Sequence, residues 1–454
     1  EVNEVKVNEK AIDNFTPLHI AAQEGHTEVV KALLEDKRIN VNEKEIDNCT
    51  PLHIAAQNGH TEVVKALLED KRINVNEKTI DNFTPLHLAA QNGHTEVVKA
   101  LLEDIKIKIN EKAINNCTPL HLAAKNGHTE VVKALLEDKR INVNEKAKDN
   151  FTPLHIAAYY GHTEMVKALL EHIKIKINEK AIDNFTPLHL AAYSGHTETV
   201  KALLEDKRIN VNEKTIDNFT PLHLAAQEGH TEVVKALLED KNINVNEKTK
   251  DNFTPLHIAA KNGHTEVVKA LLEDKRINVN EKAKDNFNPL HIAAQNGHTE
   301  VVKALLEDKN INVNEKAIDN FTPLHLAAQK GHTEVVKALL EDKRINVNEK
   351  TKDNFNPLHI AAQEGHTEVV KALLEINEVK VNEKTKDNFT PLHLAAQKGH
   401  TEVVKALLEH PNILVNEKNR YDDTPLDLAR KNDHEKIVKL LKKTIVDRKN
   451  WTEN

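Results

Sequence analysis

A block of 34 residues recurs along this chain without a break in register. Its Thr-Pro-Leu start, or an Asn-Pro-Leu variant, occurs thirteen times, at Thr16, Thr50, Thr84, Thr118, Thr152, Thr186, Thr220, Thr254, Asn288, Thr322, Asn356, Thr390 and Thr424. A fixed period of this length indicates a solenoid, in which each unit packs only on its neighbours. The repetition also limits function, because a catalytic site needs an asymmetric set of unlike residues and almost nothing here occurs only once.

One copy, residues 14–47, predicts two short helices. Thr16 before Pro17 indicates a helix start, since Thr caps a free N–H and Pro at the first helical position loses no hydrogen bond. Gly25 is expected to end this helix in the left-handed conformation. The apolar residues of 29–34 recur at three- and four-residue spacing, which predicts a second helix with one buried face.

The second half of each copy predicts an extended loop and a hairpin-like finger. Apolar residues alternate at Ile39 and Val41, and Asp47-Asn48 suits a tight turn. The segments IKIKI at 105–109 and 173–177 are expected to form a better-defined strand. Helix pairs this short cannot bury their own apolar faces, so stacking is expected to create one continuous core. The predicted fold is all-α, a curved superhelical rod of stacked helix-turn-helix units.

Composition argues against several classes of partner and of chemistry. The chain has 63 basic and 71 acidic residues, intermixed along each repeat, which argues against nucleic acid or an anionic membrane as a partner. No apolar run is long enough to cross a membrane. Cys49 and Cys117 lie two repeats apart, about 20 Å at ordinary helix spacing, too far for a disulfide, which favours a reduced, cytoplasmic setting. The only serine is Ser194, so a serine nucleophile is not expected.

Histidine is the residue type that most suggests a metal site. There are 27, and each standard copy carries two, exemplified by His19 and His26. A metal array would need imidazoles converging with carboxylate or thiolate ligands. Because these histidines recur at a fixed phase, we interpret them instead as hydrogen-bonding to backbone groups and linking adjacent units. No metal and no cofactor is expected.

The Thr-Pro-Leu-His start, the Ala-Ala…Gly-His middle and the Val-Val…Leu-Leu second helix closely resemble the ankyrin repeat family. The resemblance covers Asn14 to about Lys443, with two departures. The period is 34 where about 33 is usual, and asparagine replaces the usual turn glycine, as at Asn14 and Asn48. The resemblance implies a monomeric protein–protein interaction module whose finger tips and first-helix ends line a concave groove, and it implies no catalysis.

The repeat boundaries suggest four segments. Residues 1–13 match residues 375–387 and are expected to be the tail of a truncated preceding repeat. Residues 14–421 form twelve repeats of 34 residues, and residues 422–443 form a C-terminal capping repeat, in which Asp427 replaces histidine and Asp433 replaces glycine. A polar tail occupies 444–454.

Three tyrosines break the monotony of the predicted groove. Tyr159, Tyr160 and Tyr193 lie at the ends of two consecutive first helices, where most repeats carry Gln with Glu, Asn or Lys. Exposed tyrosines concentrate binding energy; the alternative is drift at a tolerant surface position. Together with Ser194 and nearby finger residues they make up the predicted partner-binding set: Tyr159, Tyr160, Tyr193, Ser194, Lys148, Phe151, Ile182 and Phe185.

The residue at the finger tip varies between isoleucine, as at Ile12 and Ile46, and lysine, as at Lys148 and Lys250. The isoleucines are expected either to form an apolar contact strip or to pack on the next finger, and we favour packing.

The leading functional hypothesis is a scaffold that presents a long groove to a partner protein. A second is the recognition arm of a larger toxin or effector, with its catalytic domain outside this chain and the host-cell cytoplasm as its location. A third is a mechanical spacer. A designed consensus array is the fourth, although variants copied as blocks, such as IKIKI, argue for duplication.

Overall fold

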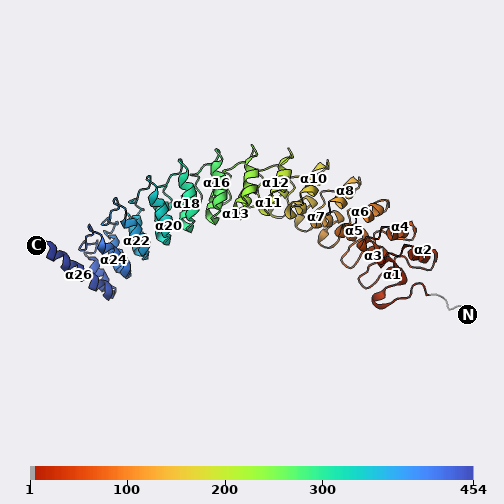
Figure 1. Cartoon of the computed structure of the whole chain (residues 1–454), viewed down its shortest axis with the longest axis horizontal. Coiled ribbons are helices and arrows are strands. Elements are labelled where there is room, and N and C mark those ends of the chain that lie inside the picture. The colour runs from red at the N-terminus through yellow and green to blue at the C-terminus, as the bar shows by residue number, and fades with distance from the viewer. Residues whose placement is uncertain (1–5, 453–454) are drawn as a thin grey trace. The chain divides into compact units, whose positions relative to one another are not determined.

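The computed structural model describes residues 6–452 of the chain, and the side chains of residues 6–447. All regular structure in this part is helical, with 26 α-helices and no strand. The chain divides into two compact units, here called unit 1 (residues 1–225 and 239–243) and unit 2 (residues 226–238 and 244–454). Each unit is a stack of helix pairs in chain order (Figure 1).

Every repeat begins with a short first helix. These are α1 (Pro17–Gln23), α3 (Pro51–Asn58), α5 (Pro85–Asn92), α7 (Pro119–Asn126), α9 (Pro153–Tyr160), α11 (Pro187–Tyr193), α13 (Pro221–Glu228), α15 (Pro255–Asn262), α17 (Pro289–Asn296), α19 (Pro323–Lys330), α21 (Pro357–Glu364), α23 (Pro391–Lys398) and α25 (Pro425–Lys431). Each starts at the predicted proline. Within a unit, each first helix packs on the first helices of the neighbouring repeats.

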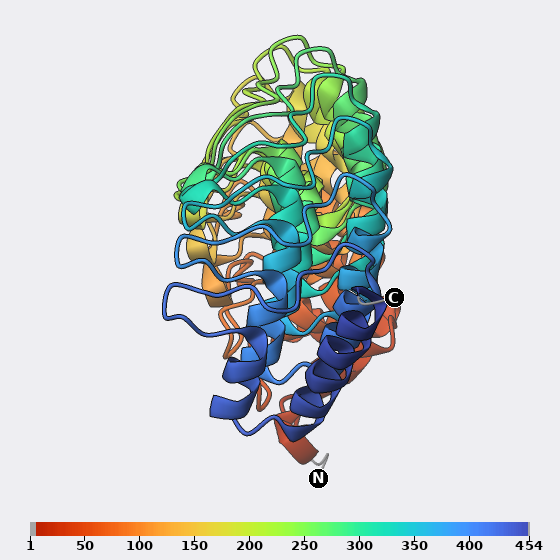
Figure 2. The ribbon, with the colours of Figure 1, turned by 90° about the vertical axis from the view of Figure 1, so that its left-hand side faces the viewer.

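A second helix follows in each repeat after a two- or three-residue turn. These are α2 (Thr27–Glu35), α4 (Thr61–Glu69), α6 (Thr95–Leu102), α8 (Thr129–Glu137), α10 (Thr163–Glu171), α12 (Thr197–Leu204), α14 (Thr231–Leu238), α16 (Thr265–Glu273), α18 (Thr299–Glu307), α20 (Thr333–Glu341), α22 (Thr367–Leu374), α24 (Thr401–Glu409) and α26 (Glu435–Thr452). In unit 2, Figure 2 shows the two kinds of helix as separate columns, with the loops that join repeats projecting to the left. The helix-turn-helix solenoid predicted from the sequence is confirmed.

The turn between the two helices requires glycine for two reasons. Gly59 ends α3 in the left-handed conformation, with φ of +77°. A Cβ at this position would also lie 2.6 Å from Nδ1 of His94, which belongs to the next repeat. Nε2 of His94 in turn donates to the backbone carbonyl of Gln57, at 2.9 Å. The turn of one repeat and the histidine of the next therefore form one joint.

A ladder of asparagines holds the loops that follow the second helices. The Asn42 side chain accepts from the backbone N–H of Asn74 (2.8 Å) and donates to the carbonyl of Arg72 (2.9 Å), both in the next repeat. The same pair of bonds recurs from repeat to repeat, for example at Asn144 and Asn246. The ladder therefore connects the loops of neighbouring repeats through side-chain bonds to the backbone.

The expected strand at IKIKI is wrong. Residues 105–106 form a turn, and Ile105 is exposed while Ile107 and Ile109 are buried. The loop is held by a side chain: Asn76 accepts from the N–H of Lys108 and donates to the carbonyl of Lys106. Alternating burial is real, but no second strand pairs with the segment.

Most finger tips take one of two conformations. The conformation follows the residue directly before the isoleucine or lysine of the tip, such as Ala147 or Thr79. Where that residue is alanine, a 3-10 turn forms and two consecutive residues have positive φ, as at Asp149 (59°) and Asn150 (65°). The six such turns are η1 (Ile12–Asn14), η2 (Ile114–Asn116), η3 (Lys148–Asn150), η4 (Ile182–Asn184), η5 (Lys284–Asn286) and η6 (Ile318–Asn320). Where it is threonine, as at Thr79, the hydroxyl accepts from the N–H of Phe83 (3.1 Å) and only Asn82 has positive φ.

Repeats 2, 4, 6, 8 and 10 each carry an arginine that reaches into the preceding repeat. Arg72 donates to the carbonyls of Leu34, Lys37 and Ile39 at 3.1–3.3 Å. Arg140 and Arg208 make the equivalent bonds in unit 1, as do Arg276 and Arg344 in unit 2. The repeats between them carry Lys106, Lys174, Asn242 and Asn310 at this position, and among the described residues these side chains make no such bond.

The last repeat differs from the others in the way its helices are capped. Asp427 replaces the usual histidine, and its carboxylate accepts from the hydroxyl and the N–H of Thr424 (2.6 and 3.1 Å). The second helix, α26, continues through the segment expected to be a polar tail. Residues 1–5 of the expected tail 1–13 lie outside the described part. None of the described helices could span a membrane.

Candidate partner-binding surface

The three tyrosines lie where the sequence placed them, at the exposed ends of two neighbouring first helices. Tyr159 and Tyr160 are the last residues of α9, and Tyr193 is the last residue of α11. All three keep 42–44 % of their surface exposed. The rings of Tyr159 and Tyr160 meet edge to face, with centroids 5.1 Å apart, and Tyr160 stacks on His162. The α9 pair thus forms a continuous aromatic surface.

The backbone beneath the aromatic surface is fixed by the next repeat. His196 Nε2 donates to the carbonyl of Tyr159, at 3.0 Å, so the end of α9 is tied to the start of α12. Gly161 ends α9 with φ of 73°, and a Cβ there would meet the ring of His196 at 2.5 Å. Ser194 follows Tyr193 as the half-buried C-cap of α11. The tyrosines are therefore presented from a rigid support, which lowers the entropy lost on binding.

The four finger residues of the predicted set fall into two kinds. Lys148 and Ile182 are exposed at finger tips. Phe151 and Phe185 are half-buried, and their rings pack on His155 and His189 of the first helices, with centroids 5.8 and 5.7 Å apart. The phenylalanines therefore join finger to helix, and only part of each ring is available to a partner.

The buried histidines have both ring nitrogens occupied. In repeat 2 the backbone N–H of Thr50 donates to Nδ1 of His53 (3.1 Å), so Nδ1 carries no proton. Nε2 then carries the proton and donates to the carbonyl of Phe83 in the next repeat (3.0 Å). The predicted structural role is confirmed, and the structure adds the tautomer. Burial lowers the pKa of His53 to about 4.

Neither metal ligands nor reactive thiols gather in the described residues. No group of three or more His, Cys, Asp or Glu side chains there is placed to hold a metal ion. Burial, together with the nearby Glu45 carboxylate, raises the pKa of Cys49 to about 12, and burial also raises that of Cys117. Both thiols are free and protonated at neutral pH.

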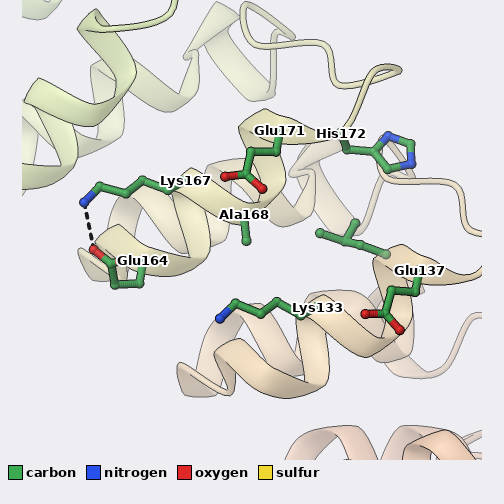
Figure 3. Close-up of a pocket in the computed structure, with 8 residues that line it drawn as sticks. Lys133, Glu137, Glu164, Lys167, Ala168, Glu171 and His172 are labelled. Carbon is green, nitrogen blue, oxygen red and sulfur yellow. Dashed lines mark hydrogen bonds and ion pairs between the residues drawn. The ribbon is translucent and has the colours of Figure 1, made fainter.

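The structure also shows a depression that the sequence did not indicate, between the second helices α8 and α10 (Figure 3). It measures about 490 Å³ and is lined by Lys133, Leu136, Glu137, Glu164, Lys167, Ala168, Glu171 and His172. Lys167 is already paired with Glu164, at 2.8 Å. Glu and Lys recur at these phases in most repeats, so only His172, which stands where most repeats have Asp, distinguishes this place in the sequence.

Comparison with known families agrees with this geometry. A family model described as ankyrin repeats (3 copies) matches residues 2–79, 18–113, 86–181, 177–249, 241–317, 290–385 and 376–450. The overlapping matches cover nearly the whole chain. No curated protein gives a significant match.

Proposed function

Since the chain belongs to the ankyrin repeat family, whose repeats are generally protein–protein interaction modules, we propose that it is a binding scaffold whose main contact is the tyrosine surface of repeats 5 and 6. The observation that carries this proposal is the exposure of Tyr159, Tyr160 and Tyr193 at the ends of α9 and α11. The other repeats before the cap place Gln or Lys at the first of these positions.

The chemistry of tyrosine supports the proposal. Its ring offers a large apolar contact area with few rotatable bonds, and its hydroxyl still bonds to water or to a partner. Such residues dominate binding energy when they sit on a well-supported surface. The tie between Tyr159 and His196 supplies that support.

We also propose that the array acts as a monomer in the cytoplasm, without nucleic acid as a partner and without catalysis of its own. The mixed charges of each repeat support the exclusion of nucleic acid. The high pKa of the Cys49 thiol leaves it a poor nucleophile, in keeping with a non-catalytic role.

The test replaces Tyr159, Tyr160 and Tyr193 together by glutamine, which most repeats carry at the phase of Tyr159 and Tyr193. Stability should stay within about 0.5 kcal/mol, because the side chains are exposed. Affinity for a partner recovered by pull-down should fall by about 2 kcal/mol or more, measured by isothermal titration calorimetry.

A matched control changes the same phase elsewhere: Gln295→Ala, Asn296→Ala and Gln329→Ala in unit 2. It should leave affinity unchanged. Equal affinity of the wild type and the tyrosine variant would show that the tyrosines are drift and that recognition lies elsewhere.

A further inference from the structure

The finger tips of the first four repeats form a continuous, hydrogen-bonded edge. The N–H of Ile46 donates to the carbonyl of Asp13 (3.1 Å), that of Ile80 to Asp47 (3.1 Å), and that of Ile114 to Asp81 (3.0 Å). Further along unit 1, the N–H groups of Lys148 and Ile182 make no such bond among the described residues, and the bond returns at Ile216, whose N–H donates to the carbonyl of Asp183 (2.9 Å). Among the described residues of unit 1, repeats 1–4 therefore carry the longest unbroken run of these bonds.

This edge carries one exposed isoleucine per repeat. Ile12, Ile46, Ile80 and Ile114, here called the isoleucine row, are 85, 63, 60 and 49 % exposed. The expectation that the tip isoleucines pack on the next finger is therefore wrong. The interior alanines, valines and leucines of this protein are almost completely buried. Four large apolar side chains that stay exposed on a fixed backbone are therefore unusual.

The isoleucine row also carries carboxylates without a cation. Asp13, Asp47 and Asp81 each follow an isoleucine of the row and are exposed. No ion pair or side-chain hydrogen bond engages these three carboxylates within residues 6–447. Lys10, Lys44 and Lys78, the nearest lysines in sequence, are paired instead with Glu43, Glu77 and Glu111.

Unit 2 contains the same hydrogen-bonded backbone edge, and there the aspartate carboxylates are paired with basic side chains. The N–H groups of Lys352, Lys386 and Arg420 donate to the carbonyls of Asp319, Asp353 and Asp387, at 2.8–3.1 Å. The three cationic side chains also pair with the carboxylates of those same aspartates, at 4.0, 3.1 and 3.0 Å. The isoleucine row has the aspartates of this arrangement and lacks its cations.

From this contrast we propose that the isoleucine row binds an extended segment of a partner protein in which a basic and an apolar residue recur once per repeat. The basic side chains would take the place that Lys352, Lys386 and Arg420 fill in unit 2. The apolar side chains would cover the isoleucines. This surface is separate from the tyrosine surface and does not depend on it.

The spacing favours a polyproline II conformation for the bound segment. Helices of neighbouring repeats pack about 8–10 Å apart, and a polyproline II helix advances about 9 Å per three-residue turn. One turn of such a segment therefore matches one repeat. A second copy of this chain does not fit, because its row would bring aspartates against aspartates.

The direct test uses fluorescein-labelled peptides and the full chain, with binding followed by fluorescence anisotropy. The probe is a peptide of four Pro-Leu-Lys triplets, one for each repeat of the row. It should bind saturably, and added salt should weaken the binding. Peptides of Pro-Leu-Glu or Pro-Ser-Lys triplets should bind at least about tenfold more weakly. Equal binding of either one would overturn the proposal.

Two variants test the proposal with residues that other repeats carry at the same positions. The double change Ile46→Lys and Ile80→Lys copies the finger tips of unit 2, and Asp47→Asn with Asp81→Asn copies Asn115. Each should weaken Pro-Leu-Lys binding by about tenfold or more, with unchanged thermal unfolding. Ile318→Lys, the same change at a finger tip of unit 2, should alter it by less than about twofold.

Three other outcomes would reject the proposal. One is an unchanged affinity in the Ile46→Lys and Ile80→Lys variant, and another is a loss of binding in Ile318→Lys as large as in that variant. The third is a dimer in sedimentation equilibrium that dissociates when Ile46 and Ile80 are changed, since the row would then bind a second copy. The tyrosine variant described above should bind the peptide like the wild type.

Discussion

Each buried histidine at the start of a first helix is neutral and bonded on both sides of its ring. Burial lowers the pKa to about 4 in nine of them: His53, His87, His121, His155, His189, His257, His291, His325 and His359. In the unfolded chain the same side chains titrate near 6.5. Protonation would place a second N–H against the backbone N–H of the preceding threonine or asparagine.

The resulting prediction concerns acid. Between about pH 6.5 and 4 the unfolded chain binds more protons than the folded chain, so the free energy of unfolding falls as pH falls through this range. The histidine contribution is complete above pH 6.5. Urea unfolding at a series of pH values should show a slope equivalent to several protons near pH 5.5. A free energy of unfolding that stays constant from pH 7.5 to 5 would contradict this.

Gly229 allows a second prediction at the scale of one residue. Its φ is +77°, and an added Cβ would lie 2.7 Å from Nδ1 of His264. Gly229→Val should therefore cost more than about 1 kcal/mol in thermal unfolding, because a β-branched residue is strained in this conformation. Gly229→Ala, tested with and without His264→Ala, separates the collision from the backbone strain. A neutral shift for valine would disprove the described turn.

Sequence reasoning identified the helix caps, the left-handed glycine and the structural histidines. It did not find that the ring of His264 rests on Gly229, because the two residues lie one repeat apart and the packing register between repeats cannot be deduced from the pattern. For the same reason the tautomer of His53 could not be predicted: the bond to Phe83 crosses into the next repeat.

At the scale of an element, the finger tip responds to a single side chain. Ala147→Thr should place a hydroxyl where it accepts from the N–H of Phe151, as Thr79 does for Phe83. It should also relieve one of the two left-handed residues at Asp149 and Asn150. We expect a gain of about 0.5–1.5 kcal/mol in the free energy of unfolding, measured in urea.

Ala147→Val is the matched control, with nearly the shape of threonine and no hydroxyl. It should give no such gain. Amide exchange of Lys148 should slow only in the threonine variant, because its N–H would then reach the preceding finger as that of Ile80 does. Equal stabilisation by both substitutions would assign the effect to packing instead.

The IKIKI loops show where element prediction fails. Alternating burial at Ile107 and Ile109 is what a half-buried strand would show, and the sequence alone could not reveal that Asn76 occupies the backbone groups a partner strand would need. Exposure at the finger tips was misjudged for a related reason. An isoleucine near a neighbouring finger buries only if the backbone turns its side chain that way.

At the scale of the whole molecule, repeat 1 is the least protected. Val29 is 50 % exposed, whereas Val63, its counterpart in repeat 2, is 0 % exposed. In a solenoid the stability of a repeat depends on its interfaces, and the exposed Val29 lies on a face of repeat 1 that the described residues leave uncovered. Hydrogen exchange followed by mass spectrometry should be fastest in residues 6–47 and slowest in the central repeats. Uniform protection along the array would contradict the prediction.

The sequence also predicted the tyrosine surface as a place, since Tyr159, Tyr160 and Tyr193 stand out against near-identical neighbours. Whether those rings touch, and how firmly they are held, depended on the tie from His196 and on the ring geometry. The curvature of the rod stays a prediction.

Because the arginines occur in alternate repeats, the hydrogen bonds between repeats differ from one interface to the next, with a period of two repeats. Arg72 and Arg140 each fasten a repeat to the one before it, whereas Lys106 and Lys174 leave theirs without that clasp. Arg276 and Arg344 set the same rhythm in unit 2. Under a pulling force or in a denaturant, interfaces with the arginine hydrogen bonds would therefore be more stable than the interfaces without them. We therefore expect the array to unfold in blocks of two repeats, although its sequence repeats every 34 residues.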